Sequence, residues 1–394
     1  MREHGVNCVV IERGRSLYER ARYDPNDIAN GVGGAGLFSD GKFSFYPSAT
    51  RLWRLEPQEE LRAAYEWVGR ILRAGSVEAP SFPTNFSDPA PLGTFGSKDY
   101  KSIYMPLQSR FAMIRELENR LGDTLHSGTS LTRVSATQSQ IMASLLNANE
   151  RTELFRAAIF ATGRLGPLLL HQAFGDSNTA FRRFEVGVRI RQPAQEFFLR
   201  DEPMLDPKRI WRSRDELREW RTFCCCKNGE IVPVRADGIV SVSGRSDVPP
   251  TGLSSVGLHL RIYEPNMAAA VWAPFLDRVK CLELPIREPL DIFLKQPARS
   301  QLNVLFGSEL AEHLREGLER VIETYSIERT NAELHGPTVE GTLYYPSVDD
   351  TLRLARLPVW VAGDASGLFR GITAALVSGY FAAIRTIKDL EIAK

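Results

Sequence analysis

The chain has 394 residues, of which 43% are hydrophobic and 25% charged, and its formal net charge is +1. These values are typical of a folded globular protein and exclude a chain that is disordered throughout. The 49 Lys and Arg residues nearly balance the 48 Asp and Glu residues, without the basic excess that marks nucleic-acid binders. Arginine is dense in residues 209–221, but acidic residues interrupt that stretch, and we interpret it as the solvated face of a helix. We therefore expect no nucleic-acid partner.

Apolar runs and cysteine usage bear on the compartment. No apolar run approaches the roughly 18 residues that a transmembrane helix needs, so we expect no membrane span. The five cysteines, three of them consecutive at 224–226, fit neither a disulfide framework nor a C-x-x-C metal pair. The six histidines are scattered without metal-ligand spacing, and no metal site is predicted. The pattern favours a reducing, cytoplasmic setting.

The N-terminal segment predicts a short buried strand over residues 6–12, preceded by a helix end that Gly5 closes. In a dinucleotide-binding unit, an acid at the end of the second strand accepts hydrogen bonds from ribose hydroxyls, about 20 residues after a glycine-rich loop. Glu12 has the corresponding place at its strand end, and the alternative is an ordinary surface acid. Because eleven residues precede Glu12, the expectation is that such a loop would fall before Met1.

Periodicity predicts the remaining elements. Helices are expected over 52–74 and 108–121, with a loop rich in Pro, Gly and Ser over 75–101 between them. Short strands are expected over 131–136, 141–146 and 157–160. Residues 168–335 differ in texture, since strand-like segments at 185–190, 238–242 and 255–262 occur with charged helices such as 308–325. We expect a second domain there, containing an antiparallel sheet. A last strand over 358–362 leads into a helix over 371–390.

Three glycine-bearing segments have the chemistry to approach a nucleotide closely, because glycine admits positive φ and lets a ligand lie against the backbone. The first is 33–36, for which the alternative is a flexible turn. The second is 161–163, after a predicted strand, although many strand–helix turns have this composition. The third places Asp364 after a strand and before a helix start, whose free N–H groups and positive dipole end favour negative charge. Its alternative is a small-residue helix packed in a core.

In this order, the segments resemble the glutathione-reductase-like superfamily of FAD-dependent oxidoreductases. More narrowly, they resemble the family of NAD(FAD)-utilising dehydrogenases. The residues that carry the resemblance are 33–42, 160–164, 185–189, 222–226 with 229–232, and 363–379. The superfamily's first strand and its G-x-G-x-x-G loop are not in this sequence. We therefore expect an exposed sheet face near Val9, and we leave open whether the chain retains FAD.

The resemblance implies FAD as cofactor, with NAD(P)H as a potential electron donor, and it assigns roles to individual residues. Glu12 matches the ribose-binding acid, and Arg110 a position that approaches phosphate or ribityl groups. Val134 lies near the strand that meets adenine, Asp364 at the ribityl chain, and Ile372 beneath the isoalloxazine. The predicted cofactor-binding residues are Glu12, Arg13, Gly33, Gly34, Ala35, Gly36, Arg110, Val134, Ala161, Thr162, Gly163, Gly363, Asp364, Gly371 and Ile372. No catalytic acid or base is nominated.

We therefore predict an α/β protein with a Rossmann-like, glutathione-reductase-type FAD domain formed by residues 1–167 and 336–394, and an α+β substrate domain formed by residues 168–335. The expected function is FAD-dependent oxidation or reduction of a small organic substrate, with hydride or electrons passing through flavin N5. The alternatives are an FAD-dependent monooxygenase and a non-catalytic remnant of a flavoprotein. Cys224–Cys226 are interpreted as buried small hydrophobes, with a redox thiol near the flavin as the alternative. The oligomeric state is left open.

Overall fold

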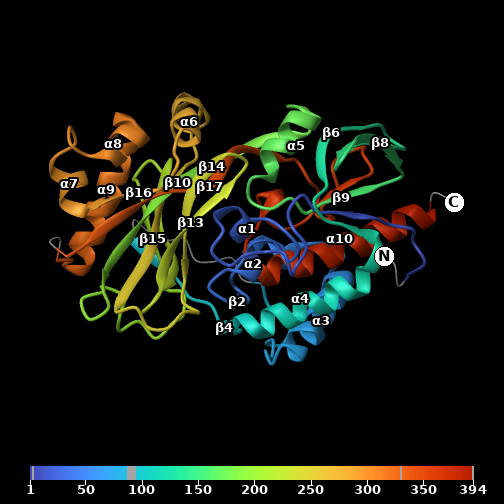
Figure 1. The fold of residues 1–394 in the computed structure, drawn as a ribbon, viewed down its shortest axis with the longest axis horizontal. Coiled ribbons are helices and arrows are strands. Elements are labelled where there is room, and N and C mark those ends of the chain that lie inside the picture. The colour runs from blue at the N-terminus through green and yellow to red at the C-terminus, as the bar shows by residue number, and fades with distance from the viewer. Residues whose placement is uncertain (2–3, 87–94, 329–330, 393–394) are drawn as a thin grey trace.

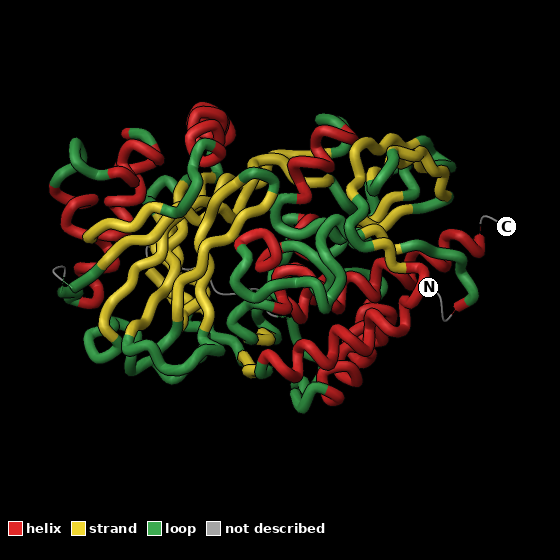
Figure 2. Tube along the Cα trace, in the orientation of Figure 1, coloured by secondary structure: helices red, strands yellow, loops and turns green. Residues whose placement is uncertain are grey.

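The computed structural model describes residues 1, 4–86, 95–328 and 331–392. A large antiparallel sheet lies between two groups of helices (Figure 1). Helices α7, α8 and α9 lie on one side of the sheet, while α1, α2, α3, α4 and α10 gather on the other side with short strands and loops, as the tube in Figure 2 also shows.

The first part of the chain supplies most of that second group. Its elements are β1 (Val10–Ile11), α1 (Pro25–Ala29), α2 (Gly34–Leu37), β2 (Lys42–Ser44), η2 (Thr50–Arg54), α3 (Gln58–Ala74), β3 (Phe95–Lys98), β4 (Ser102–Tyr104), α4 (Leu107–Leu121), η3 (Gly122–Thr124), β5 (Leu125–His126), β6 (Ser130–Ala136), β7 (Ile141–Leu146), β8 (Glu150–Phe155), β9 (Ala158–Phe160) and α5 (Gly166–Phe174).

The rest of the chain builds the large sheet and returns to the first group. Its elements are β10 (Thr179–Pro193), β11 (Lys208–Arg212), β12 (Arg218–Cys226), β13 (Glu230–Ala236), β14 (Ile239–Arg245), β15 (Leu253–Ile262), α6 (Pro265–Lys280), β16 (Ile286–Pro289), α7 (Leu290–Lys295), α8 (Gln301–Phe306), α9 (Ser308–Tyr325), β17 (Glu333–Pro346), β18 (Val359–Val361), η4 (Gly363–Ser366) and α10 (Ile372–Ile392).

The large sheet has the strand order β16-β17-β10-β15-β12-β11-β3, and every pairing in it is antiparallel. Side chains of β10 alternate between its two faces. Phe184, Val186 and Val188 belong to a core that also contains apolar side chains of α6, α8 and α9. Glu185 lies on the opposite face, toward the first group of elements. The antiparallel sheet expected in this part of the chain is therefore confirmed, and β17 carries it past residue 335.

The first group of elements has its own core around α3 and α10. The buried positions of α3 recur with helical spacing, as at Leu61, Tyr65, Val68 and Leu72. Trp67 of α3 stacks on Tyr380 of α10, with ring centroids 4.5 Å apart. This packing fixes α10 and therefore the position of its N-terminal turn.

Parallel pairing is confined, among the described strands, to β1 with β5 and β18 with β9. Each of these ladders contains two strands. Val9, just before β1, is 38% exposed, and the exposed sheet face expected near it stays a prediction. The structure thus has a mixed α/β fold with a large antiparallel sheet. That the elements around α3 and α10 form a glutathione-reductase-type domain stays a prediction.

Several predicted elements need correction. Residues 209–221 are not a helix face, because β11 and β12 pair there as neighbouring strands. The loop predicted over 75–101 contains β3, which pairs with β11 at the edge of the large sheet, and residues 87–94 lie outside the described part. The strand predicted over 6–12 is limited to β1. The helix predicted over 52–74 is divided at Pro57, which has no backbone N–H, into η2 and α3.

Residues 2 and 3 of the predicted N-terminal helix end lie outside the described residues. Gly5 adopts φ +69°, as a helix-closing glycine would. Within the described part of the chain, none of the helices combines the length and the apolar character needed to cross a bilayer.

Candidate cofactor site

The glycine segment and the start of α10 lie against each other, although they come from opposite ends of the chain. A Cβ atom on Gly36 would lie 3.1 Å from Cγ1 of Ile372. Gly33 has φ +89°, and a Cβ there would lie 3.0 Å from Cγ2 of Ile114 in α4. A larger residue at either position would push these elements apart. Ala35, by contrast, is exposed. The contact unites two of the predicted segments.

The segment 161–163 joins them because β9 and β18 run parallel. Phe160 is in register with Val361, and its carbonyl accepts a hydrogen bond from the N–H of Ala362 at 2.9 Å. Parallel strands bring their carboxyl ends to one edge, which is where ligands bind in α/β sheets. Ala161 and Thr162 are exposed at this edge, and Gly163 follows with φ +71°.

The loop between β18 and α10 holds polar side-chain atoms that are buried without a partner. Gly363 adopts φ +65° and donates its N–H to Oγ of Ser378 in α10 at 2.9 Å. Oδ1 of Asp364 is buried and has no hydrogen-bond partner among the described residues, and the same holds for Oγ1 of Thr373. Gly371, with φ +103°, is exposed immediately before the helix. The helix start also has backbone N–H groups without intrahelical acceptors.

The charge state of Asp364 is also unusual. Burial, with a smaller contribution from the nearby Glu340 carboxylate, raises the pKa of Asp364 to about 6, although Arg370 and Arg164 oppose the shift. Arg370 donates to a Glu340 carboxylate oxygen at 2.9 Å, and Arg164 forms an ion pair with the same carboxylate. A buried carboxyl group with a shifted pKa beside unpaired donors is typical of a functional site.

Behind this loop, Glu185 lies in a buried set of ionic contacts that we call the Glu185 cluster, formed with Arg183, Arg261, Arg370 and His259. The nitrogens of Arg261, Arg183 and Arg370 lie 2.9, 3.0 and 3.4 Å from Oε2 of Glu185. Nδ1 of His259 lies 3.1 Å from Oε1 and donates to it.

The electrostatics of the Glu185 cluster follow from these contacts. Burial opposes the ionisation of Glu185, but Arg261, Arg370, His259 and Arg183 outweigh it and hold its pKa well below the usual range. Burial lowers the pKa of His259 to about 4, against the pull of Glu185, so the imidazole is neutral at pH 7. Arg370, two residues before α10, connects the large sheet to the candidate cofactor loop.

Glu12 and Arg13 have protein partners. Oε1 of Glu12 accepts hydrogen bonds from the backbone N–H groups of Gly14 and Gly31, at 2.7 and 3.1 Å. Arg13 forms an ion pair with Asp237, in the turn between β13 and β14. These contacts stabilise the first loop, and a cofactor role for either residue stays a prediction.

Arg110 also has protein partners. It is buried, and its Nη1 donates to the carbonyl oxygens of Gly36, Leu37 and Ser39 at 3.1, 2.7 and 2.9 Å. Its Nη2 forms an ion pair with Asp247. Burial lowers the pKa of Arg110, which Asp247 partly offsets. The guanidinium thus holds the end of α2 in place.

Val134 is buried in a separate apolar cluster with Phe160, Val359 and Val361.

Of the predicted residues, the structure brings together those of 33–36, 161–163, 363–364 and 371–372. Sequence reasoning missed Glu340, Arg370 and Thr373, and it noted Glu185 only as part of a motif. A carboxylate at an alternating position of an otherwise apolar strand was the available signal for Glu185.

Two cavities lie away from these segments. One, of about 120 Å³, is lined by β13 and β15 residues that include Glu230 and Ser255. The other, of about 330 Å³, lies between Phe198 and Tyr325. Neither is lined by a predicted cofactor residue.

Comparison with known proteins gives structural neighbours only, since no family model and no curated protein matches the sequence. A flavoprotein/dehydrogenase from Cytophaga hutchinsonii is 13% identical with a TM-score of 0.31, and the alignment covers 75% of this chain and 57% of that one. A putative FAD containing monooxygenase from Photorhabdus luminescens is 9% identical with a TM-score of 0.35, and the alignment covers 100% of this chain and 88% of that one. The 2,6-dihydroxypyridine-3-hydroxylase from Arthrobacter nicotinovorans is 12% identical with a TM-score of 0.38, and the alignment covers 99% of this chain and 78% of that one.

The chain thus spans little more than half of the first of these proteins. Because the TM-scores of all three proteins are below 0.5, we base the assignment of function on the residues of this chain.

Proposed function

We propose that the chain is an FAD-dependent oxidoreductase of the glutathione-reductase-like type, acting on a small organic substrate. The observation that carries the proposal is two buried oxygens without partners among the described residues, Oδ1 of Asp364 in η4 and Oγ1 of Thr373 in the first turn of α10. A buried polar atom without a partner costs free energy that a ligand's hydrogen bonds can recover. Beside them, Gly36 leaves backbone, and no side chain, facing Ile372. This arrangement suits the ribityl chain and ring of a flavin.

The residues present would share the cofactor in the following way. The carboxylate of Asp364 would accept hydrogen bonds from ribityl hydroxyls, and the first N–H groups of α10 would face the ring near N1. The positive end of α10, together with Arg370, would stabilise negative charge there. Bound FAD would supply transfer of hydride or electrons. The described hydrogen bonds of Glu12 use Oε1, which leaves Oε2 for ribose. Arg13 and Arg110 have protein partners, so no phosphate is placed on them.

The absorbance spectrum of the purified protein, before and after addition of FAD, tests the proposal. We expect a band of bound flavin near about 450 nm that survives removal of free FAD by gel filtration. A protein that shows no flavin band after free FAD has been removed would contradict the proposal. Reduction of the bound flavin by NADH or NADPH without oxygen would then identify the electron donor.

Substitutions at Gly36 test where the flavin lies. Gly36→Ala is expected to weaken FAD binding a few-fold and Gly36→Val about tenfold or more, because the added carbons press on Ile372 and displace the start of α10. Quenching of FAD fluorescence during titration gives the dissociation constants. Gly379→Ala is the control, because Gly379 also lies in α10 and a Cβ there would meet no described atom within 4 Å. Equal affinities for all four proteins would refute this position.

A further inference from the structure

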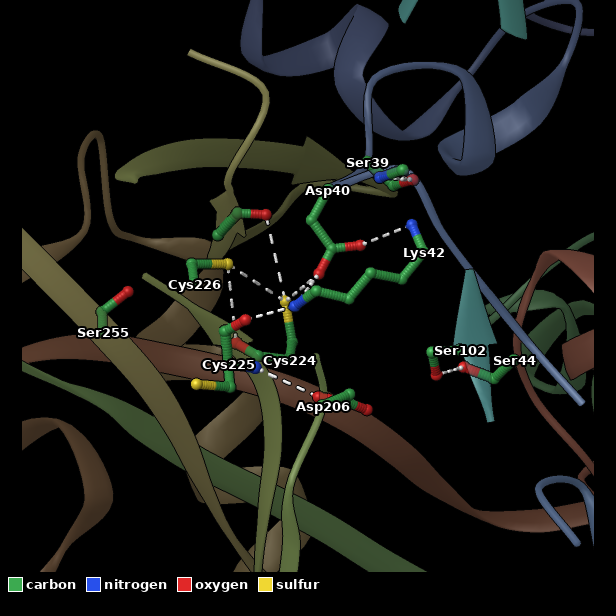
Figure 3. Close-up of polar contacts among 12 residues, drawn as sticks. Ser39, Asp40, Lys42, Ser44, Ser102, Asp206, Cys224, Cys225, Cys226 and Ser255 are labelled. Carbon is green, nitrogen blue, oxygen red and sulfur yellow. Dashed lines mark hydrogen bonds and ion pairs between the residues drawn. The ribbon is translucent and has the colours of Figure 1, made fainter. Parts of the chain in front are cut away.

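Two cysteine side chains meet near the end of β12 (Figure 3). Sγ of Cys224 lies 3.8 Å from Sγ of Cys226 and 3.4 Å from Oδ2 of Asp40. In a regular strand, alternate residues are separated by about 6.6 Å along the chain. Here the register against β15 shifts between Phe223 and Cys226, and Cys224 has φ +47°, which is uncommon for a residue other than glycine. The irregular backbone brings the two sulfurs together.

Two buried cations lie beside this cysteine pair. Nζ of Lys42 lies 2.9 Å from Oδ2 of Asp40 and donates to the carbonyl oxygen of Cys225. The buried Arg189 donates to the carbonyl oxygen of Cys224 at 2.8 Å. Both cations come from other elements, Lys42 from β2 and Arg189 from β10. They favour a negative charge on the sulfurs.

The hydrogen bond between the two cysteines changes the pKa of each thiol. The hydrogen bond from the Cys224 thiol lowers the pKa of Cys226 to about 6; burial opposes this shift, as does Asp40, while Arg189 and Lys42 support it. The same hydrogen bond, followed by burial, raises the pKa of Cys224. The contacts therefore favour a thiolate on Cys226 and a proton on Cys224. By contrast, burial raises the pKa of Cys225 to about 12.

The ligand atoms of Asp40, Cys224 and Cys226 also lie close enough together to hold a metal ion, within 4.8 Å of one another. The ammonium group of Lys42 already contacts the Asp40 oxygen that faces Cys224. A divalent cation would be repelled by this ammonium and by Arg189. The same charges stabilise a thiolate, so the surroundings suit thiol chemistry better than metal binding.

We propose that Cys224 and Cys226 form a redox-active dithiol, which a small-molecule disulfide oxidises to an intramolecular disulfide. Cys224 is the partly exposed member of the pair. After the proton of the Cys224 thiol passes to Cys226, the Cys224 thiolate attacks the disulfide RSSR, forms a mixed disulfide and releases RS⁻. Cys226 gives its proton to that RS⁻ and attacks the Cys224 sulfur, releasing the second RS⁻. The cysteines lose two electrons, and RSSR becomes RSH and RS⁻.

The dithiol follows from contacts that involve no cofactor, so it stands or falls apart from the proposed FAD site. Its position is nevertheless informative. Asp40 and Lys42 lie on the chain just after α2, so the loop that continues from the glycine segment also contacts the dithiol. A two-electron thiol couple would thus lie next to the segment proposed to pass the flavin.

Alkylation of the whole chain in glutathione buffers tests the dithiol. After equilibration at a series of oxidised-to-reduced ratios, an acid quench and iodoacetamide treatment, trypsin releases residues 222–227, which contain all three cysteines. We expect this peptide to carry three alkyl groups under reducing conditions and one under oxidising conditions. The oxidised peptide with one alkyl group should weigh two hydrogens less than the same peptide after its disulfide is reduced. Cys225→Ser, the control, should go from two to none. Cys224→Ser and Cys226→Ser should form no internal disulfide.

Three results would overturn the proposal. One is a wild-type peptide that keeps three alkyl groups at every ratio, or that accumulates only the mixed disulfide with glutathione. Another is a Cys225→Ser protein that no longer oxidises. The third is purified protein with stoichiometric metal that Cys224→Ser releases. In addition, Lys42→Gln should raise the pH at which the pair is alkylated at half its maximal rate, because the variant lacks a cation that lowers the pKa of Cys226. An unchanged midpoint would deny the role of the cations.

Discussion

Replacing Glu185 with alanine is expected to lower the free energy of unfolding by about 3–5 kcal/mol, the cost of leaving buried charges without their partner. The variant would retain Arg183, Arg261 and Arg370 around an empty space, with Glu340 still paired to Arg370 and Glu219 still 3.5 Å from Arg261. Because Arg370 precedes α10, we also expect the candidate cofactor loop to loosen. Urea unfolding followed by tryptophan fluorescence measures the change. Glu66→Ala, at an exposed position of α3, is the control and should stay within about 0.5 kcal/mol of wild type.

The pH dependence gives this prediction a second readout. The pKa of Glu185 in the folded protein is well below its usual value, so its contribution to stability is complete above the unfolded pKa of about 4.3. That contribution is lost as the pH falls through the folded pKa. The difference between wild type and Glu185→Ala should therefore be constant from pH 6 to 8 and shrink in acid. A Glu185→Ala protein as stable as Glu66→Ala at pH 7 would contradict the role of the cluster.

Asp364→Asn is expected to act in opposite directions on stability and on FAD binding. Burial raises the pKa of Asp364 to about 6, so wild type loses stability as the pH rises from about 4 to 6. The amide cannot ionise, and the variant should be more stable than wild type by about 1–3 kcal/mol at pH 8 and similar to it at pH 4. The same change removes a charged acceptor and should weaken FAD binding by about tenfold or more.

Thermal unfolding without FAD and fluorescence titration with FAD measure the two effects separately. The control is Asp277→Asn, at an exposed position of α6, for which neither quantity should change appreciably. A variant that is less stable at pH 8 would show that Asp364 is a structural group. Unchanged affinity for FAD would remove it from the cofactor site.

Local pattern was enough to predict the elements that bury one face. Helical spacing of apolar residues located α3 and α4, a charged stretch located α9, and a small-residue stretch located α10, while strand-like segments located β10 and β15 of the large sheet. The stretch 209–221 was misread because its charges satisfy one another between neighbouring strands, as Glu219 does with Arg212. Such pairs depend on the register of distant segments, and composition alone resembles a solvated helix. β3 was missed because its partner, β11, lies more than 100 residues away.

The candidate site divides in the same way. The glycine segment and the strand-loop-helix around Asp364 are local patterns, and both could be read from the sequence. The Glu185 cluster could not, because it needs Glu185 opposite Arg261 and Arg370 brought over from the last loop. The redox alternative for the consecutive cysteines was open from the sequence. The positive φ of Cys224 and the approach of Lys42, on which the proposed dithiol rests, arise only in the folded chain.

Hydrogen–deuterium exchange of the whole chain with and without FAD tests the central claim most directly, because it locates the ligand as well as detecting it. We predict that FAD slows exchange chiefly in peptides covering residues 33–37 and 363–376, the glycine segment and the loop that begins α10. Peptides from α6 and α9, on the far face of the large sheet, should be unaffected. Protection confined to other segments, or none at saturating FAD, would contradict the assignment of this site.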